Sequence, residues 1–78
     1  MSELVNQARG LINAASAAIA ASWKEPSPYL TLLARIIVSE AKRRRPDDAT
    51  IQSIDLEGHN PDYNEISAAM DVIVKALG

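Results

Sequence analysis

Apolar residues recur with helical spacing in the first part of the chain. At about 100° per residue, Leu4, Leu11 and three alanines fall on one arc with the other apolar residues of this segment, while Asn6 and Arg9 lie opposite. This pattern predicts an amphipathic helix over residues 3–22. Gly10 lies outside the apolar arc and costs such a helix about 1 kcal/mol relative to alanine.

A second helix is predicted over residues 28–45, because Ser27 followed by Pro28 is typical of a cap and a first helical position. Its apolar residues cover most of the circumference and leave only a narrow polar strip. A helix of this kind has to be covered on several sides. Either the other two helices cover it completely, or a second copy of the chain or another protein does.

We favour a partner as the cover of the second helix, because one neighbouring helix cannot bury all of its large side chains. Grouped aliphatic and aromatic residues of this kind are typical of protein interfaces. The predicted partner or dimer interface consists of Trp23, Tyr29, Leu32, Ile36 and Val38.

A third helix is predicted over residues 61–77, where Asn60 and Pro61 repeat the cap-and-proline pair and Ile66, Met70 and Ile73 recur at helical spacing. Residues 46–60 allow two interpretations: a short helical turn capped by Asp47 or Asp48, which we favour, or a strand over residues 50–56. Gly58 is expected to make a bend. The predicted fold is all-α, a small bundle of three main helices in a single domain over residues 1–78.

A chain of 78 residues has a small core, and its composition limits how that core can be reinforced. With no cysteine and one histidine, disulfides and a structural metal are not expected, which leaves helix packing or oligomerisation. The apolar run over residues 11–22 lacks the basic flank of a secretion signal and is not apolar enough to span a membrane. We therefore expect a cytoplasmic protein without membrane contact.

Charge is distributed unevenly along the chain. Residues 1–45 carry seven cations and three anions, a net charge of +4, while residues 46–78 carry one cation and seven anions, a net charge of −6. An acidic half can present its carboxylates to a basic partner. The candidates for such a contact are Asp47, Asp48, Asp55, Glu57 and Asp62.

The basic cluster at the end of the second helix has two interpretations. The favoured one is structural: cations in a last helical turn complement the helix dipole, and Arg44 pairs with Glu40 one turn earlier. The alternative is a phosphate or acidic-partner contact formed by Arg35, Lys42, Arg43, Arg44 and Arg45. Nucleic-acid binding is the less favoured interpretation, because the chain is acidic overall, two aspartates follow at once and no aromatic residues are interleaved with the cations.

Two isolated residues, Glu40 and His59, carry groups that could take part in chemistry. Glu40 falls on the apolar arc, where it either reaches water or Arg44 or forms a buried catalytic carboxylate; the first is favoured, because no second carboxylate or histidine is suitably spaced. His59 is expected to be a solvated loop residue rather than a transition-metal ligand. No catalytic residue, cofactor or metal site is predicted.

These observations together predict a small non-catalytic protein-binding regulator or inhibitor. It is expected to act as a homodimer through the second helix, with its acidic C-terminal half directed at a target protein. A nucleic-acid-binding regulator that uses the basic cluster is the alternative.

Overall fold

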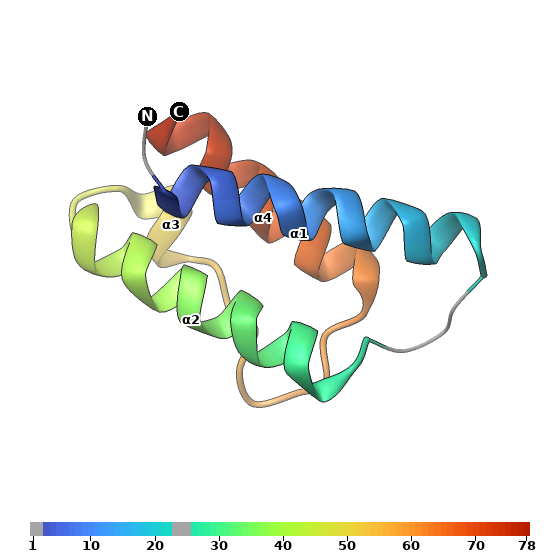
Figure 1. Cartoon of the computed structure of the whole chain (residues 1–78). Coiled ribbons are helices and arrows are strands. Elements are labelled where there is room, and N and C mark those ends of the chain that lie inside the picture. Colours follow the sequence, from blue (N-terminus) through green and yellow to red (C-terminus); the bar gives the residue numbers. More distant parts are fainter. Residues whose placement is uncertain (1–2, 23–25) are drawn as a thin grey trace.

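The computed structural model describes residues 3–22 and 26–78, and in these ranges the chain is helical without any strand (Figure 1). The helices are α1 (Glu3–Ala20), α2 (Pro28–Arg44), α3 (Ala49–Gln52) and α4 (Tyr63–Leu77). The predicted all-α bundle of three main helices is confirmed. The strand considered for residues 50–56 is wrong, because a short helix occupies the start of this segment and a loop the rest.

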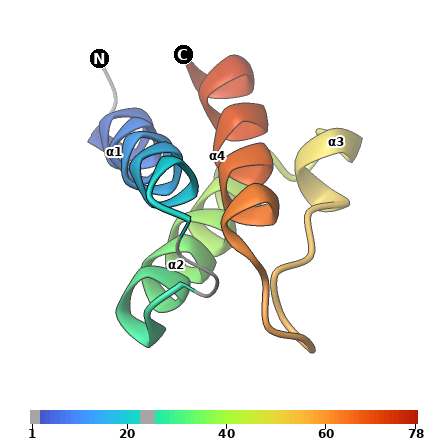
Figure 2. The same cartoon turned by 90° about the vertical axis from the view of Figure 1, so that its right-hand side faces the viewer.

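Helices α1 and α4 form the most extensive helix pair and run antiparallel, side by side (Figures 1 and 2). Helix α2 lies across both of them, and α3 contacts α2 and α4. Among the described residues, α1, α4 and α3 lie against part of the circumference of α2, and their positions determine which of its many apolar residues enter the core.

The core draws side chains from all four helices. Fully buried alanines lie where α1 and α2 face their neighbours, and their small side chains allow the helices to approach closely. Ile51 is the contribution of α3 and is completely buried. The buried cluster consists of Leu4, Ala8, Leu11, Ala34, Ile37, Val38, Ala41, Ile51, Leu56, Ile66, Ala69, Met70 and Ile73.

The predicted starts of α2 and α3 are confirmed by their caps. The hydroxyl of Ser27 accepts a hydrogen bond from the amide of Leu30 at 3.1 Å, and Pro28 occupies the first helical turn. A carboxylate oxygen of Asp48 accepts from the amides of Thr50 and Ile51. In each case a side chain satisfies backbone donors that have no partner inside the helix.

Helix α4 starts two residues later than predicted. Its cap is Asp62, whose carboxylate accepts from the amide of Glu65 at 2.8 Å, and the first helical residue is Tyr63. Asn60 and Asp62 are both good capping residues, so the sequence pattern cannot choose between them. Pro61 is buried and directly precedes this cap, so it lies before the helix rather than in its first turn.

The connection between α3 and α4 is attached to α2 by one side chain. Arg35 donates from Nε to the carbonyl oxygen of Leu56 at 2.9 Å and from Nη2 to that of His59 at 3.0 Å. Leu56 is buried in the core, and Gly58 makes the predicted bend with a φ of 81°. A positive φ of this size favours glycine, because a Cβ atom would crowd the backbone.

Within the described ranges, no helix has the length and apolar character needed to cross a membrane.

Candidate protein-binding surface

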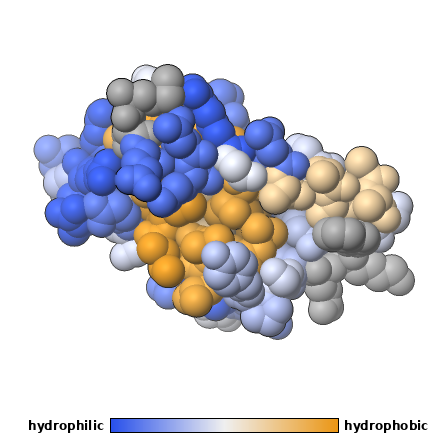
Figure 3. All heavy atoms as spheres, viewed as in Figure 1, coloured by the Kyte–Doolittle hydropathy of each residue, from blue (hydrophilic) through white to orange (hydrophobic). Residues whose placement is uncertain are grey.

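Three large apolar side chains project from α2 away from the core. Tyr29 is 70% exposed, and Leu32 and Ile36 are each 54% exposed. Their spacing of three and four residues places them on one side of the helix, and we call these three residues the outer face of α2. Figure 3 shows an apolar patch over the middle of α2, bordered by polar residues toward the C-terminal end of the helix.

The prediction that Val38 belongs to this interface is wrong. It is only 6% exposed and belongs to the core together with Ala34, Ile37 and Ala41. The physical reason is rotation along the helix: Val38 lies two residues after Ile36, which is about 200° around the axis. When Ile36 points to solvent, Val38 has to point inward. Trp23, the remaining member of the predicted interface, lies outside the described residues.

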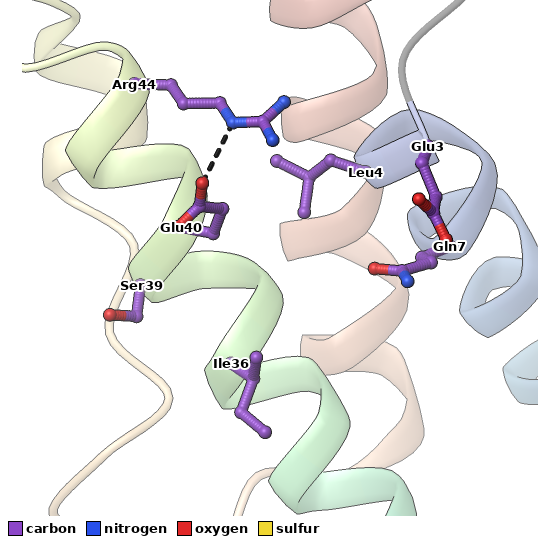
Figure 4. A pocket seen from close by; sticks show the side chains of 7 residues that line it. All are labelled: Glu3, Leu4, Gln7, Ile36, Ser39, Glu40 and Arg44. Carbon is purple, nitrogen blue, oxygen red and sulfur yellow. Dashed lines mark hydrogen bonds and ion pairs between the residues drawn. The ribbon is translucent and has the colours of Figure 1, made fainter.

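A groove of about 480 Å³ adjoins the outer face of α2. Ile36, Ser39, Glu40 and Arg44 line it from α2, and Glu3, Leu4 and Gln7 line it from the start of α1. Figure 4 shows Leu4 and Arg44 pointing from the two helices into the space between them. Since Ile36 belongs to both features, the apolar face continues into a groove with a polar rim, as in many protein-binding sites.

Glu40 at the edge of this groove forms an ion-pair cluster with the basic end of α2. Its carboxylate accepts from Arg43, with 3.0 Å between Arg43 Nε and Glu40 Oε2, and from Arg44 Nε at 3.0 Å. The hydrogen bonds from Arg43 and then Arg44 lower the pKa of Glu40 to about 2. The predicted pair with Arg44 is confirmed, and the pair with Arg43 was not anticipated although its spacing of three residues allows it.

The other predicted cations lie on a different side of α2 and face acidic residues of the same chain. Arg35 and Lys42 line a small cleft of about 110 Å³, and Asp55 and Glu57 line it from the α3–α4 connection. Arg35 is also engaged with two backbone carbonyl oxygens, as described above. The structure therefore brings together two members of the predicted basic set and two of the predicted acidic set, while Arg45 lies beside Asp47 in a separate hollow at the end of α2.

Three of the predicted acidic contacts also have a role in the backbone. Asp48 and Asp62 cap α3 and α4, and Asp55 accepts a hydrogen bond from the amide of Glu57 at 2.9 Å. Asp47 and Glu57 lie on the exposed surface between α2 and α4. The acidic set thus lies along the chain between α2 and α4. Three of its members, Asp48, Asp55 and Asp62, stabilise turns and helix starts.

His59 was expected to be a solvated loop residue, and it is exposed but not isolated. Its Nε2 lies 2.6 Å from a carboxylate oxygen of Glu65 in the first turn of α4, and its Nδ1 lies 3.3 Å from the carbonyl oxygen of Glu57. The hydrogen bond with Glu65 is the main reason why the pKa of His59 is raised. The six-residue separation gave no helical signal, so only the folded loop reveals this pair.

Across residues 3–22 and 26–78, no three His, Asp or Glu side chains are grouped so that they could hold a metal ion. Comparisons with protein-family models, with curated proteins and with solved structures found no match for this chain. The case for a function therefore depends on the surfaces of the molecule.

Proposed function

We propose that this protein is a small non-catalytic protein-binding regulator or inhibitor, located in the cytoplasm, that acts as a homodimer through the outer face of α2. The observation that carries the proposal is the position of Tyr29, Leu32 and Ile36 on the side of α2 opposite its core residues. Large apolar side chains that adjoin one another on a surface, with a polar rim, are typical of interaction sites.

The acidic second half supports the other part of the proposal. Residues 46–78 carry a net charge of −6, and most of the carboxylates around the α2–α4 connection are exposed. Such a surface attracts a basic target and speeds its association. In this proposal the outer face of α2 joins the two copies, and the acidic surface meets the target.

The alternative function, nucleic-acid binding through the end of α2, has less support from the geometry. Glu40 is paired with both Arg43 and Arg44, and Arg35 is engaged with backbone carbonyl oxygens. Each of these pairs opposes phosphate binding, because a phosphate would have to compete with a partner that is already in place.

The test of the homodimer is sedimentation velocity over a range of protein concentrations. We expect the natural chain to form a dimer that dissociates on dilution, and Ile36→Glu to sediment as a monomer with unchanged helical circular dichroism. Asn64→Glu is the matched control, since Asn64 is exposed and lies on α4 rather than on α2. A natural chain that stays monomeric at its highest soluble concentration would remove the homodimer from the proposal.

A further inference from the structure

Two exposed side chains lie at equal distances from Ile36 on the same side of α2. Tyr29 lies seven residues before Ile36, and Arg43 lies seven residues after it, beyond the outer face. Seven residues are close to two helical turns, so the three side chains share one side of the helix at intervals of about 10 Å. Leu32 and Glu40 lie four residues on either side of Ile36, so a two-fold axis there would place Leu32 of one copy near Glu40 of the other, where Arg43 and Arg44 already pair with the carboxylate.

A two-fold axis through Ile36 would place the two ends of this face against each other. In that arrangement α2 of one copy runs antiparallel to α2 of the other, and Arg43 of each copy meets Tyr29 of its partner. Both side chains are available for the contact, since the side chain of Arg43 is 72% exposed and Tyr29 is 70% exposed. Arg43 uses the edge of its guanidinium for Glu40, which leaves the flat face for stacking on an aromatic ring.

The charges along α2 also select this direction. A parallel pair would bring the two basic ends together, with Lys42 and three arginines from each copy, and would align the two helix dipoles. An antiparallel pair separates the basic ends and opposes the dipoles.

We propose that the occupant of the outer face of α2 is a second copy of this chain, paired antiparallel about Ile36, with each Arg43 stacked on the Tyr29 of the other copy. The inference rests on the proposed function, because it assigns the geometry of the same apolar face. The three apolar side chains expose on the order of 300 Å² in each copy, at the lower end of functional patches. This apolar area is smaller than that of a standard interface, so we expect a weak dimer that dissociates on dilution.

Disulfide trapping tests the direction of pairing, because the chain has no cysteine of its own. Tyr29→Cys and Arg43→Cys are made as separate proteins, mixed in equal amounts and oxidised mildly. The antiparallel pair predicts that the mixed 29–43 disulfide dominates over the two homodisulfides, well above its statistical share in a denatured mixture. Adding Ile36→Glu to both chains should remove this excess, while an exposed cysteine on α4, Asn64→Cys, should give no preferred partner.

The stacked contact is tested by Arg43→Gln, with Arg45→Gln as the matched control. We expect Arg43→Gln to weaken the dimer roughly five- to thirty-fold, since two symmetric contacts are lost, and Arg45→Gln to weaken it much less. An equal effect of the two substitutions would overturn the stacking of Arg43 on Tyr29.

Other outcomes separate the inference from the function on which it rests. Dominant homodisulfides from a chain that does dimerise would overturn the antiparallel geometry and leave the homodimer in place. A monomeric chain whose binding to a target protein is abolished by Ile36→Glu would overturn the second copy as occupant, and the protein-binding function would stand.

Discussion

Gly10 and Gly58 differ in backbone conformation, since Gly10 is helical and Gly58 has a positive φ. Gly10 lies inside α1 on the exposed surface, and a Cβ atom added there meets no other atom within 4 Å. Gly58 has the same open surroundings but a φ of 81°, in the left-handed region. The same substitution should therefore have opposite effects at the two positions, because the backbone rather than the space around it decides the result.

We predict that Gly10→Ala raises the free energy of unfolding by about 1 kcal/mol, since alanine is the better helix former. Gly58→Ala should lower it by about 1 to 2 kcal/mol, because an L side chain is strained at this φ. Urea unfolding followed by circular dichroism measures both changes. A loss of stability in Gly10→Ala would show that α1 packs against a partner at this exposed position.

The wrong prediction for Val38 also has its explanation in the position of a single residue. Ile36 and Val38 are both large and aliphatic, and both are predicted to lie in the interface because one neighbouring helix cannot bury all the large side chains of this helix. Their separation of two residues places them about 200° apart on a helix, so at most one of them can belong to the outer face. Which one faces outward depends on the position of α1 and α4, and the structure buries Val38.

At the scale of elements, the α3–α4 connection is held between two helices. Arg35 binds two of its carbonyl oxygens from α2, and His59 reaches Glu65 in the first turn of α4. When His59 is protonated, both ring nitrogens donate, one to Glu65 and one to the carbonyl oxygen of Glu57. The protonated form is therefore the one that the folded connection favours.

This contact predicts a pH dependence with a defined sign. The pKa of His59 is higher in the folded chain than in the unfolded chain, so the folded state binds the proton more tightly. The stabilisation is fully present below the unfolded pKa of about 6.5 and is lost as the pH rises through the folded pKa. We expect the natural chain to exceed Glu65→Gln in stability by more at about pH 5.5 than at about pH 8.

The measurement is thermal unfolding of both chains across this pH range, together with an NMR titration of the His59 ring. In Glu65→Gln the pKa of His59 should fall toward its ordinary value. An unchanged titration would contradict the pair. His59→Gln is the control, because it removes the titrating group and should remove most of the difference between the two ends of the pH range.

Elements also differ in how well their limits could be predicted. Ser27 is predicted as a cap because it precedes a proline and a clear helical pattern, and the structure confirms it. For the short helix the sequence leaves Asp47 and Asp48 as alternative caps, and the structure shows that Asp48 is the cap. The start of α4 was placed too early, because Asn60 and Asp62 offer two caps around one proline. The structure shows that Asp62 is the cap, since its backbone is extended and its carboxylate accepts from the amide of Glu65.

For the whole molecule, the charge asymmetry has a direct consequence for nucleic acid. The net charge is −2, and the cations that could bind phosphate are either paired with Glu40 or face acidic residues. We predict that neither duplex nor single-stranded DNA is shifted by this protein at physiological salt in a gel mobility assay. The expected reason is that too few phosphates can be neutralised to release counterions.

Glu40→Gln gives this prediction a positive control, since it removes the carboxylate from Arg43 and Arg44 and should allow weak binding at low salt. Salt-dependent binding by the natural chain that is lost in a chain with Arg43→Gln and Arg45→Gln would instead favour the nucleic-acid alternative.

Local patterns in the sequence by themselves determined that the chain is helical and that Glu40 pairs with Arg44. They also determined that one helix begins after Ser27, and they limited the cap of the short helix to Asp47 or Asp48. These features depend on residues within one or two turns of each other, where spacing fixes the geometry. Only the tertiary structure decided which side of α2 is buried, because apolar residues surround most of that helix and its neighbours choose the side they cover. The pair of His59 with Glu65 and the attachment of Arg35 to the α3–α4 connection were decided in the same way, since a loop brings these groups together without any periodic signal.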